Sequence, residues 1–214
     1  MKDIPMFTTE YGTASLLLKE IPYRQEAYIR IHTVVPGMPE ELLKECITFC
    51  VMAGAEKIYA TGDEHLQNYP LYTAVYEMQG EAVVDKSILE SLFPVTDATV
   101  ERWRKIYNEK MRSVDNAGTL TSFDEKQITQ SGGAYFVHRD GELLGIGWMD
   151  DTQLLAVAAV KPGAGRRVLN TLLSMVEGAT VTLEVASTNE RAIALYEKMG
   201  FIRTRELSRW YRVK

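Results

Sequence analysis

The stretch from Gln153 to Phe201 constrains the fold more than any other part of this sequence, because it carries the signals of a strand, a glycine turn, a helix, a second strand and a second helix in unbroken order. Leu154 to Val160 is a nearly continuous apolar run, which is typical of a strand covered on both faces. Pro162, Gly163 and Gly165 end this strand at once. The order predicts an α/β core.

The glycine turn is followed by an amphipathic helix and by a strand whose two faces differ. Between Arg166 and Gly178, apolar residues recur at helical spacing: Val168, Leu169, Leu172, Leu173 and Val176. The next segment alternates polar with aliphatic residues: Thr180, Thr182 and Glu184 against Val181, Leu183 and Val185. Strand, helix and strand in this order predict a parallel pair joined by a right-handed crossover. A capping box of Ser187 with Glu190 then begins a second helix, which ends at Gly200.

The glycine turn also predicts an anion site. Gly163, Ala164 and Gly165 allow a tight turn before a helix N-terminus, whose free amide hydrogens and dipole favour a phosphate. Arg166 and Arg167 add positive charge. The alternative is a loop that only joins the strand to the helix, and the turn by itself does not decide between the two.

The motifs V-K-P, G-A-G-R-R-V-L, L-E-V and N-x-x-A-x-x-L-Y-E-K-M-G-F follow one another in this stretch. Together they resemble the acetyl-CoA binding core of the GNAT N-acetyltransferase superfamily. The last motif is the most specific, and its residues stand where that family has its closing helix: Asn189, Ala192, Leu195, Tyr196, Glu197, Lys198, Gly200 and Phe201. The resemblance covers residues 95–214 and implies a sheet of mixed antiparallel and parallel strands, flanked by helices.

One departure from the family concerns the phosphate loop. The family usually carries several more residues between Pro162 and Gly163, often including an arginine or a glutamine, and this sequence has none. The loop is therefore shortened, and the glycines and the helix N-terminus remain to hold a pyrophosphate.

Composition and charge bear on partners and location. The 214 residues are 46% hydrophobic and 25% charged, which is ordinary for a globular chain. A net charge of −5 without a dense run of Lys and Arg argues against a nucleic-acid partner and suits a cationic amine substrate. The sequence contains no apolar run long enough for a membrane span and no secretory signal at its start, so we expect a cytoplasmic protein that does not bind membranes.

The two cysteines, Cys46 and Cys50, lie four residues apart on one face of a predicted helix. Packing as small apolar side chains is the favoured interpretation, and a metal or redox role is the alternative. No histidine pair is near them, and we expect no metal site.

The first 90 residues partly repeat the order of the core. They predict two strands, a helix and a third strand: Thr13–Leu18, Tyr28–Val35, Glu40–Ala53 and Lys57–Thr61. The segment 71–80 weakly matches the closing-helix motif. We therefore expect residues 1–90 to form a degenerate, partial GNAT-like unit and residues 91–214 to form the GNAT acetyltransferase domain, as in tandem members of the superfamily. Pro39 leaves fewer free amides at the first helix, so we expect no second cofactor there, and the unit would complete the sheet or wall off the acceptor pocket.

Between the two regions and at the C-terminus, the pattern predicts further strands around one helix. Leu92–Val95 is a predicted strand, and a core helix follows over 100–114. The polar segment 115–133 is expected to be mobile and close to the acceptor site. A hairpin is predicted around Asp140-Gly141, from Ala134–His138 to Leu143–Trp148. Phe201–Thr204 and Ser208–Val213 are expected as two closing strands, with Trp210 in the core.

Acetyl transfer to an amine requires a proton for the departing thiolate and a base for the ammonium group. Tyr196 is the candidate acid, and the resemblance places the acid of GNAT enzymes at this position; a tyrosine that only fills the helix stripe is the alternative. Glu184 is the candidate base and resembles the glutamate that some members use on this strand; a solvated surface glutamate is the alternative. Asp150, Asp151 and His138 are weaker candidates.

The resemblance also assigns the cofactor contacts. A backbone amide among Ala158, Ala159 and Val160 would bind the thioester carbonyl, while the same strand edge pairs with the pantetheine arm. Asn189 would either bond to the pantetheine or cap the last helix.

These expectations define an acyltransferase that moves acetyl from acetyl-CoA to a primary amine by direct attack. The acceptor is a small-molecule amine or a protein amine, and a homodimer is left open. A catalytically silent module that binds acyl-CoA or a protein partner is the competing hypothesis, motivated by the shortened loop, and a structural protein without a cofactor is the third.

Overall fold

The computed structural model describes residues 2–214 and has the mixed α/β architecture that the sequence predicts. The chain divides into two compact units: residues up to Ala74 with Glu206–Lys214 form the first, and Val75–Arg205 form the second. The strands β5 (Leu71–Glu81) and β11 (Ile202–Arg212) contribute residues to both units. The sequence places the division between residues 90 and 91, and Met1 of its N-terminal unit lies outside the described residues.

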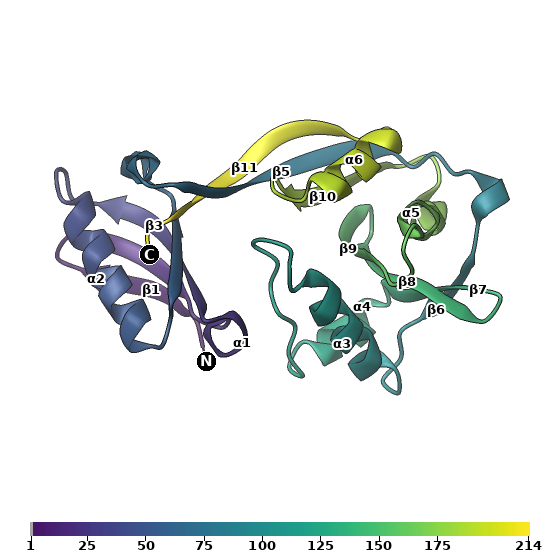
Figure 1. Ribbon diagram of the computed structural model, residues 1–214, viewed down its shortest axis with the longest axis horizontal. Helices are drawn as coiled ribbons and strands as arrows, with labels where there is room; N and C mark the ends of the chain where they lie inside the picture. Colours follow the sequence, from purple (N-terminus) through teal and green to yellow (C-terminus); the bar gives the residue numbers. More distant parts are fainter. Residues whose placement is uncertain (1) are drawn as a thin grey trace. The chain divides into compact units, whose positions relative to one another are not determined.

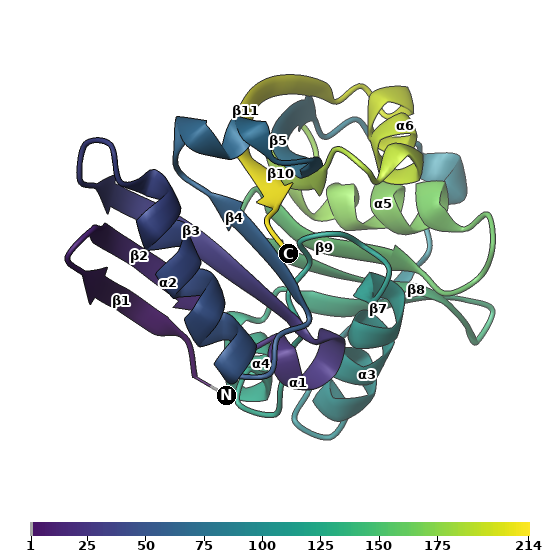
Figure 2. The same ribbon diagram turned by 60° about the vertical axis from the view of Figure 1, so that its left-hand side comes forward.

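The first unit is an antiparallel meander that leads into a parallel pair. Its elements are β1 (Ile4–Thr9), β2 (Gly12–Leu17), α1 (Ile21–Arg24), β3 (Glu26–Val34), α2 (Pro39–Met52), β4 (Lys57–Thr61) and η1 (Glu64–Asn68). β1, β2 and β3 pair antiparallel, β3 and β4 pair in parallel, and the end of β11 joins β4. Figure 2 shows α2 lying along the strands β2 and β3.

The inner face of α2 explains why the first unit has a core. Leu42, Leu43, Cys46 and Cys50 are buried there against the sheet. Burial raises the pKa of both thiols to about 12, so they stay protonated. The cysteines therefore act as small apolar side chains, as the packing interpretation predicts.

The second unit repeats this order of pairing and adds a closing helix. Its elements are η2 (Lys86–Ile88), β6 (Ser91–Pro94), α3 (Val100–Met111), α4 (Glu125–Ser131), β7 (Ala134–Arg139), β8 (Glu142–Asp150), β9 (Gln153–Ala159), α5 (Gly165–Leu173), η3 (Ser174–Val176), β10 (Thr180–Ala186) and α6 (Glu190–Lys198). The strand order is β11-β5-β10-β9-β8-β7-β6, in which β10 and β9 are parallel and their other neighbours are antiparallel. The elements can be followed in Figure 1.

Two apolar clusters hold the second unit together, one on each face of its sheet. α5 and α6 belong to one cluster, through residues that include Leu169, Leu172 and Tyr196. α3 and α4 belong to the other, around Trp103 and Ile128. No helix within residues 2–214 combines the length and apolar character needed to cross a membrane.

The segment before β6 is fastened to α5 by polar side chains that are themselves buried. The Asn170 side chain exchanges two hydrogen bonds with the backbone of Asp85, at 2.8 and 3.0 Å. Thr171 accepts from the Glu90 amide at 3.1 Å. Asn170 and Thr171 are at most 1% exposed, so these bonds satisfy groups that would be costly to bury alone.

Several local predictions were wrong. α6 is capped by Asn189, whose Oδ1 accepts from the Ala192 amide at 3.3 Å, and not by Ser187. The segment 71–80, which matched a helix motif, belongs to the strand β5, whose residues from Val75 onward pair with β10. The segment 115–133 contains the helix α4, and the two predicted closing strands are one. Trp210 is buried, as predicted.

The contact of α5 with β8 leads to a prediction about stability. A Cβ on Gly147 would lie 2.2 Å from Cδ1 of Leu172, so Gly147→Ala should destabilise the fold by about 1–3 kcal/mol. Leu172→Ala should cost about 2–5 kcal/mol. The double variant should be no less stable than Leu172→Ala, because the new methyl group enters vacated space; urea unfolding measures all three.

The control is Gly147→Ala combined with Leu169→Ala. Leu169 is buried on the same helix but is not among the atoms nearest to that Cβ, so the two costs should add. If Gly147→Ala were as non-additive with Leu169→Ala as with Leu172→Ala in the free energy of unfolding, the contact between Gly147 and Leu172 would be contradicted.

Candidate functional site

The site is built where β9 leaves β10. The two strands pair in parallel only at Gln153 and Leu154, opposite Thr182 and Leu183, while β10 stays paired with β5 up to Ala186. At this point the register of β9 against β8 shifts, because Trp148 faces Ala156 while Met149 faces Leu154, which leaves Leu155 as an extra residue. A bulge of this kind bends its strand, and the bend accounts for the divergence.

The bulge coincides with a position that departs from the prediction that β9 is covered on both faces. Leu155 is 42% exposed, and exposure alternates along the strand. Beyond Leu154, Ala158 belongs to the cluster of α3 and Val157 and Ala159 pack against the cluster of α5 and α6, while all three also line the opening.

The hydrogen bonds of β9 show which backbone groups face this opening. The Val160 amide donates to the Leu144 carbonyl at 2.8 Å. Hydrogen-bonded pairs alternate along an antiparallel ladder, so Ala158 is also bonded to β8. The amides of Val157 and Ala159 therefore point into the opening. The amides of Ala158, Ala159 and Val160 were the expected donors to the thioester carbonyl. Of these, only the Ala159 amide faces the opening, together with the amide of Val157.

A cavity of 640 Å³ fills the opening and reaches both faces of the sheet. From the face of α5 and α6 it is lined by Asn189, Leu195 and Tyr196. From the other face it is lined by the end of α3 and the residues after it: Tyr107, Lys110, Met111, Val114, Asp115, Asn116, Ala117 and Gly118. The structure thus brings Tyr196, Glu184, Asn189, Gly165 and the β9 residues around one cavity.

Tyr196 borders the cavity from a buried position. Its side chain is 7% exposed, and its ring lies 6.0 Å from that of Phe201. Burial raises the pKa of Tyr196 to about 12. The phenol is therefore neutral and keeps its proton across the physiological range.

Glu184 borders the cavity from the opposite face. Its neighbours Leu183 and Val185 are buried in the cluster of α5 and α6, so alternation places Glu184 on the face of α3. Among the described residues, no hydrogen bond or ion pair ties down its carboxylate. Glu77 of β5 stands directly opposite in the ladder.

Two like charges in this position repel each other. The negative charge of Glu77 is compensated by the groups that bind its carboxylate. Arg205 donates to Glu77 at 2.8 Å, Thr204 at 2.9 Å and Gln79 at 3.3 Å. The bonds from Arg205 and Thr204 hold the pKa of Glu77 below its ordinary value. Glu184 is therefore the carboxylate of this pair that stays available for chemistry.

The glycine turn lies at the other end of the cavity. Gly163 adopts φ = 79°, which favours glycine, and no atom lies within 4 Å of the position of a Cβ. Gly165 begins α5, where the first amides have no partner inside the helix. A Cβ on Gly165 would lie 3.2 Å from Leu195, so glycine lets α5 approach α6 closely. Gly163 and Ala164 border an adjacent hollow instead of the main cavity.

Neither expected arginine lines the main cavity. Arg166 forms an ion pair with Asp85 at 3.6 Å, and Arg167 forms one with Glu90 at 2.7 Å. Both carboxylates belong to the segment fastened over α5, which sequence spacing does not reveal. Arg167 borders the adjacent hollow beside Gly163.

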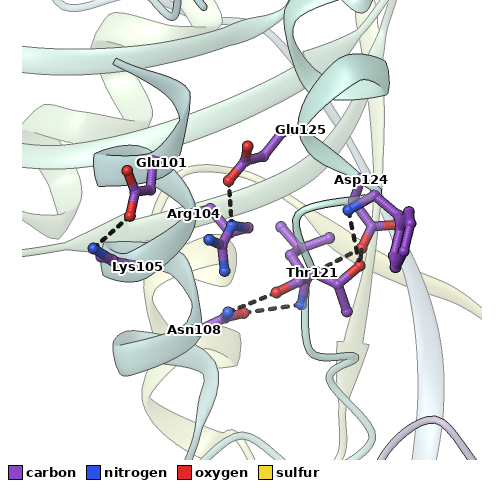
Figure 3. A network of polar contacts seen from close by, with 9 residues as sticks. Glu101, Arg104, Lys105, Asn108, Thr121, Asp124 and Glu125 are labelled. Atoms are coloured by element: carbon purple, nitrogen blue, oxygen red, sulfur yellow. Dashed lines mark hydrogen bonds and ion pairs between the residues drawn. The ribbon is translucent and has the colours of Figure 1, made fainter. Parts of the chain in front are cut away.

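The segment after α3 is held by a polar network and is not an unstructured loop (Figure 3). The Asn108 side chain exchanges hydrogen bonds with the backbone of Leu120, at 2.8 and 2.9 Å. Arg104 binds Glu125 at 2.6 Å, and Asp124 accepts from Thr121. The network joins the C-terminal end of residues 112–120, which include part of the cavity lining, to α3.

Asp115 of this segment lines the cavity and also accepts a hydrogen bond from Thr188 Oγ1, at 2.7 Å. The sequence interpretation missed Asp115, Glu77 and Arg205, because each acquires its role from a contact between distant segments. Placing 115–133 near the acceptor site was the one signal that pointed to Asp115.

The weaker candidates lie elsewhere. Asp150 and Asp151 form the turn between β8 and β9, where Asp151 has φ = 50° and neither lines the cavity. His138 borders a separate cavity at β6 and β7. Within residues 2–214, no group of three His, Cys, Asp or Glu side chains is placed to hold a metal ion.

Comparison with known proteins identifies related sequences for part of the chain. Residues 100–201 match the model of the Acetyltransferase (GNAT) family. The N-alpha-acetyltransferase RimI of Mycobacterium tuberculosis is 47% identical over 51 residues, which are 24% of this chain and 32% of that protein. An uncharacterized protein of Mycobacterium leprae is 30% identical over 131 residues, which are 55% of this chain and 36% of that protein. The matches thus span about a third of the length of these two relatives.

Solved structures share the fold at low sequence identity. A GCN5-related N-acetyltransferase from Sphaerobacter thermophilus has a TM-score of 0.56 at 10% identity, covering 94% of this chain and 76% of that chain. A conserved protein of unknown function from Staphylococcus epidermidis has a TM-score of 0.56 at 13% identity, covering 99% and 94%. A GCN5-related N-acetyltransferase from Kribbella flavida has a TM-score of 0.57 at 13% identity, covering 94% and 55%.

The buried phenol predicts how stability depends on alkaline pH. Because the pKa of Tyr196 is about 12 in the folded chain and 10.0 ordinarily, the folded state keeps this proton longer than the unfolded state. Its contribution is complete below pH 10 and is lost as the pH rises toward 12. Urea unfolding at about pH 9 and pH 11 should show that the wild type loses about 1 kcal/mol more than Tyr196→Phe. Equal losses would mean that the phenol titrates as if exposed.

The pairing of Glu77 predicts a shift at acid pH. Since its pKa is held below the ordinary value, its bonds stabilise the fold above that value, and the stabilisation is lost as the pH falls through the lowered pKa. Arg205→Gln should raise the pKa of Glu77, as measured by ¹³C NMR of its carboxyl group. Arg209→Gln, on the same strand but bonded to Glu206, is the matched control and should leave Glu77 unchanged. An unmoved titration in Arg205→Gln would show that Arg205 does not neutralise Glu77.

Proposed function

We propose that this chain transfers an acetyl group from acetyl-CoA to a primary amine by direct attack, and the match of residues 100–201 to the Acetyltransferase (GNAT) family model supports this proposal. The observation that carries the proposal is the placement of a neutral phenol and a free carboxylate on opposite faces of one opening in the sheet. This arrangement lets an acyl donor and an amine approach the same point from opposite sides.

The residues around the opening fit acetyl-CoA, which supplies the acetyl group as a thioester. The amides of Val157 and Ala159 would bind the pantetheine arm and the thioester carbonyl, because they lie on the edge of β9 that has no strand partner. The N-terminus of α5 at Gly165 would receive the diphosphate. Asn189 caps α6 through Oδ1, which leaves its Nδ2 donor for the arm.

The chemistry assigned to the chain consists of two proton transfers. Glu184, directly or through a water molecule, accepts a proton from the ammonium group, so that the neutral amine can form the new C–N bond. Tyr196 donates its proton to the thiolate as the C–S bond breaks, and regains one when the amide nitrogen loses its second proton to solvent. The carboxylate lies on the face of α3. The other charged groups around the cavity are Lys110, Asp115, Lys161 and Arg191, of which Arg191 comes from α6.

We assign the acceptor side to the segment after α3. It lines the cavity on the face that carries Glu184, and the network of Asn108 and Arg104 holds it in place. Small-molecule amines and protein amines both remain candidate acceptors.

For the first unit, we propose a structural role without a second cofactor. β3 and β4 stay paired over five positions, from Glu26 with Lys57 to Arg30 with Thr61, so these strands do not open as β9 and β10 do. Pro39 begins α2 and removes one amide from its first turn. The proposal that residues 1–90 are a degenerate GNAT-like copy rests on the order of pairing that the two units share.

One observation favours a second function, a module that binds acyl-CoA without catalysis. The shortened turn provides few amides, and both nearby arginines are engaged by carboxylates. Such a module would bind the cofactor but release no thiol when amines are added.

The test measures the release of free coenzyme A from acetyl-CoA with a panel of primary amines, together with calorimetric binding of coenzyme A. Tyr196→Phe should lower kcat by roughly 10²–10⁴-fold with little change in cofactor affinity. Glu184→Gln should lower the rate near neutral pH and recover in part at alkaline pH, where more amine is neutral. Thr182→Val, on the same face of β10, is the control and should keep most of the activity.

Cofactor binding without thiol release for any amine would support the silent module. No cofactor binding at all would remove both functions. Full activity in Tyr196→Phe with chemistry as the slow step would remove this residue as the acid.

A further inference from the structure

A second cavity of 420 Å³ lies at the β6 side of the second unit, and it shares no lining residue with the cavity of Tyr196. It is formed by β6, β7, the hairpin after β7 and the first turn of α3. Its lining combines two aromatic rings with a few polar groups: Ser91, Phe93, Pro94, Thr96, Thr99, Arg102, Phe136, His138, Asp140 and Gly141. Volumes of roughly 300–1,000 Å³ are usual for small-molecule sites.

The two phenylalanines of the cavity differ in exposure, because Phe136 is buried and Phe93 is not. Phe93 is 52% exposed on β6, the last strand in the order of the sheet. Its ring meets that of His138 edge to face at 5.0 Å, and Phe136 lies 6.2 Å from the same imidazole. These rings form an aromatic wall that a flat, apolar body could cover.

His138 presents a hydrogen-bond donor at this wall. Its Nδ1 is buried and has no hydrogen-bond partner among the described residues. A proton on Nδ1 would be a buried donor without an acceptor, so the neutral ring carries its proton on Nε2. Burial, and then the charge of Arg102, lower the pKa of His138, which agrees with a neutral ring.

Arg102 supplies a positive charge that the rest of the chain leaves uncompensated. Its guanidinium lies 6.0 Å from the centre of the Phe136 ring, and no carboxylate within residues 2–214 pairs with it. Asp140, the acidic residue of the lining, is paired with Arg139 at 3.5 Å. An unpaired guanidinium and an imidazole N–H beside aromatic rings are complementary to a carboxylate on an apolar body.

We propose that this cavity binds a small carboxylate with an aromatic or alicyclic body. The body lies against Phe93, Phe136 and His138, and the carboxylate accepts hydrogen bonds from Arg102 and from Nε2 of His138. The site does not depend on acetyl transfer, because it is separate from the cavity of Tyr196.

The experiment titrates the full chain with phenylacetate by calorimetry and by ¹⁵N-resolved NMR. Saturable binding should shift the signals of Phe93, Arg102 and His138, and it should persist with saturating coenzyme A. Benzylamine and 2-phenylethanol, which lack the carboxylate, and acetate, which lacks the ring, should each bind at least tenfold more weakly. These comparisons use the wild-type chain, so they do not depend on how any variant folds.

Variants then assign the contacts. Arg102→Gln should weaken phenylacetate binding roughly tenfold or more, because a charge-assisted hydrogen bond is lost. Arg112→Gln is the matched control at the opposite, exposed end of α3 and should leave the affinity unchanged. Displacement by coenzyme A, equal binding of benzylamine, or an equal loss in both arginine variants would each overturn the proposal.

Discussion

The candidate site depends on a strand that can keep only one of its two neighbours. β9 remains bonded to β8 through the bulge at Leu155 and loses β10 beyond Leu154. Backbone amides that face away from a partner are costly in a buried sheet and useful beside a ligand. The divergence therefore creates the cavity, exposes the amides of Val157 and Ala159 and separates the two faces on which Tyr196 and Glu184 lie.

The electrostatics of the two faces follow from their surroundings. On the face of α5 and α6, apolar packing keeps the phenol of Tyr196 neutral. On the other face, Glu77 and Glu184 stand opposite each other, and Arg205 donates a hydrogen bond to Glu77 while its charge also interacts with that of Glu184. Arg205 reaches this place only because β11 runs beside β5. Local burial thus keeps Tyr196, the proposed acid, protonated. The strand β11, which is distant in sequence, supplies the charge next to Glu184, the proposed base.

The sequence predicts those parts of the fold that depend on local periodicity. The alternation around Glu184 and the helix before Gly178 match β10 and α5 closely, because each pattern is long and regular. The exposure of β9 could not be predicted, since an apolar run looks the same in a covered strand and in one that lines a cavity. The engagement of Arg166 and Arg167 was equally hidden, because Asp85 and Glu90 approach α5 from a segment nearly eighty residues earlier in the chain. Tyr196 and Glu184 were found because both lie in the resembling stretch.

The membership of β11 in both units has a consequence for biosynthesis. Glu206–Lys214 belong to the first unit, yet a ribosome makes them after every residue of the second. Until then β4 lacks its outer neighbour, and an unpaired strand edge is open to wrong partners. Translation therefore cannot deliver a finished N-terminal unit ahead of the rest, as it does when domains mature one after another. The first unit can therefore be completed only after Glu206–Lys214 have been synthesised.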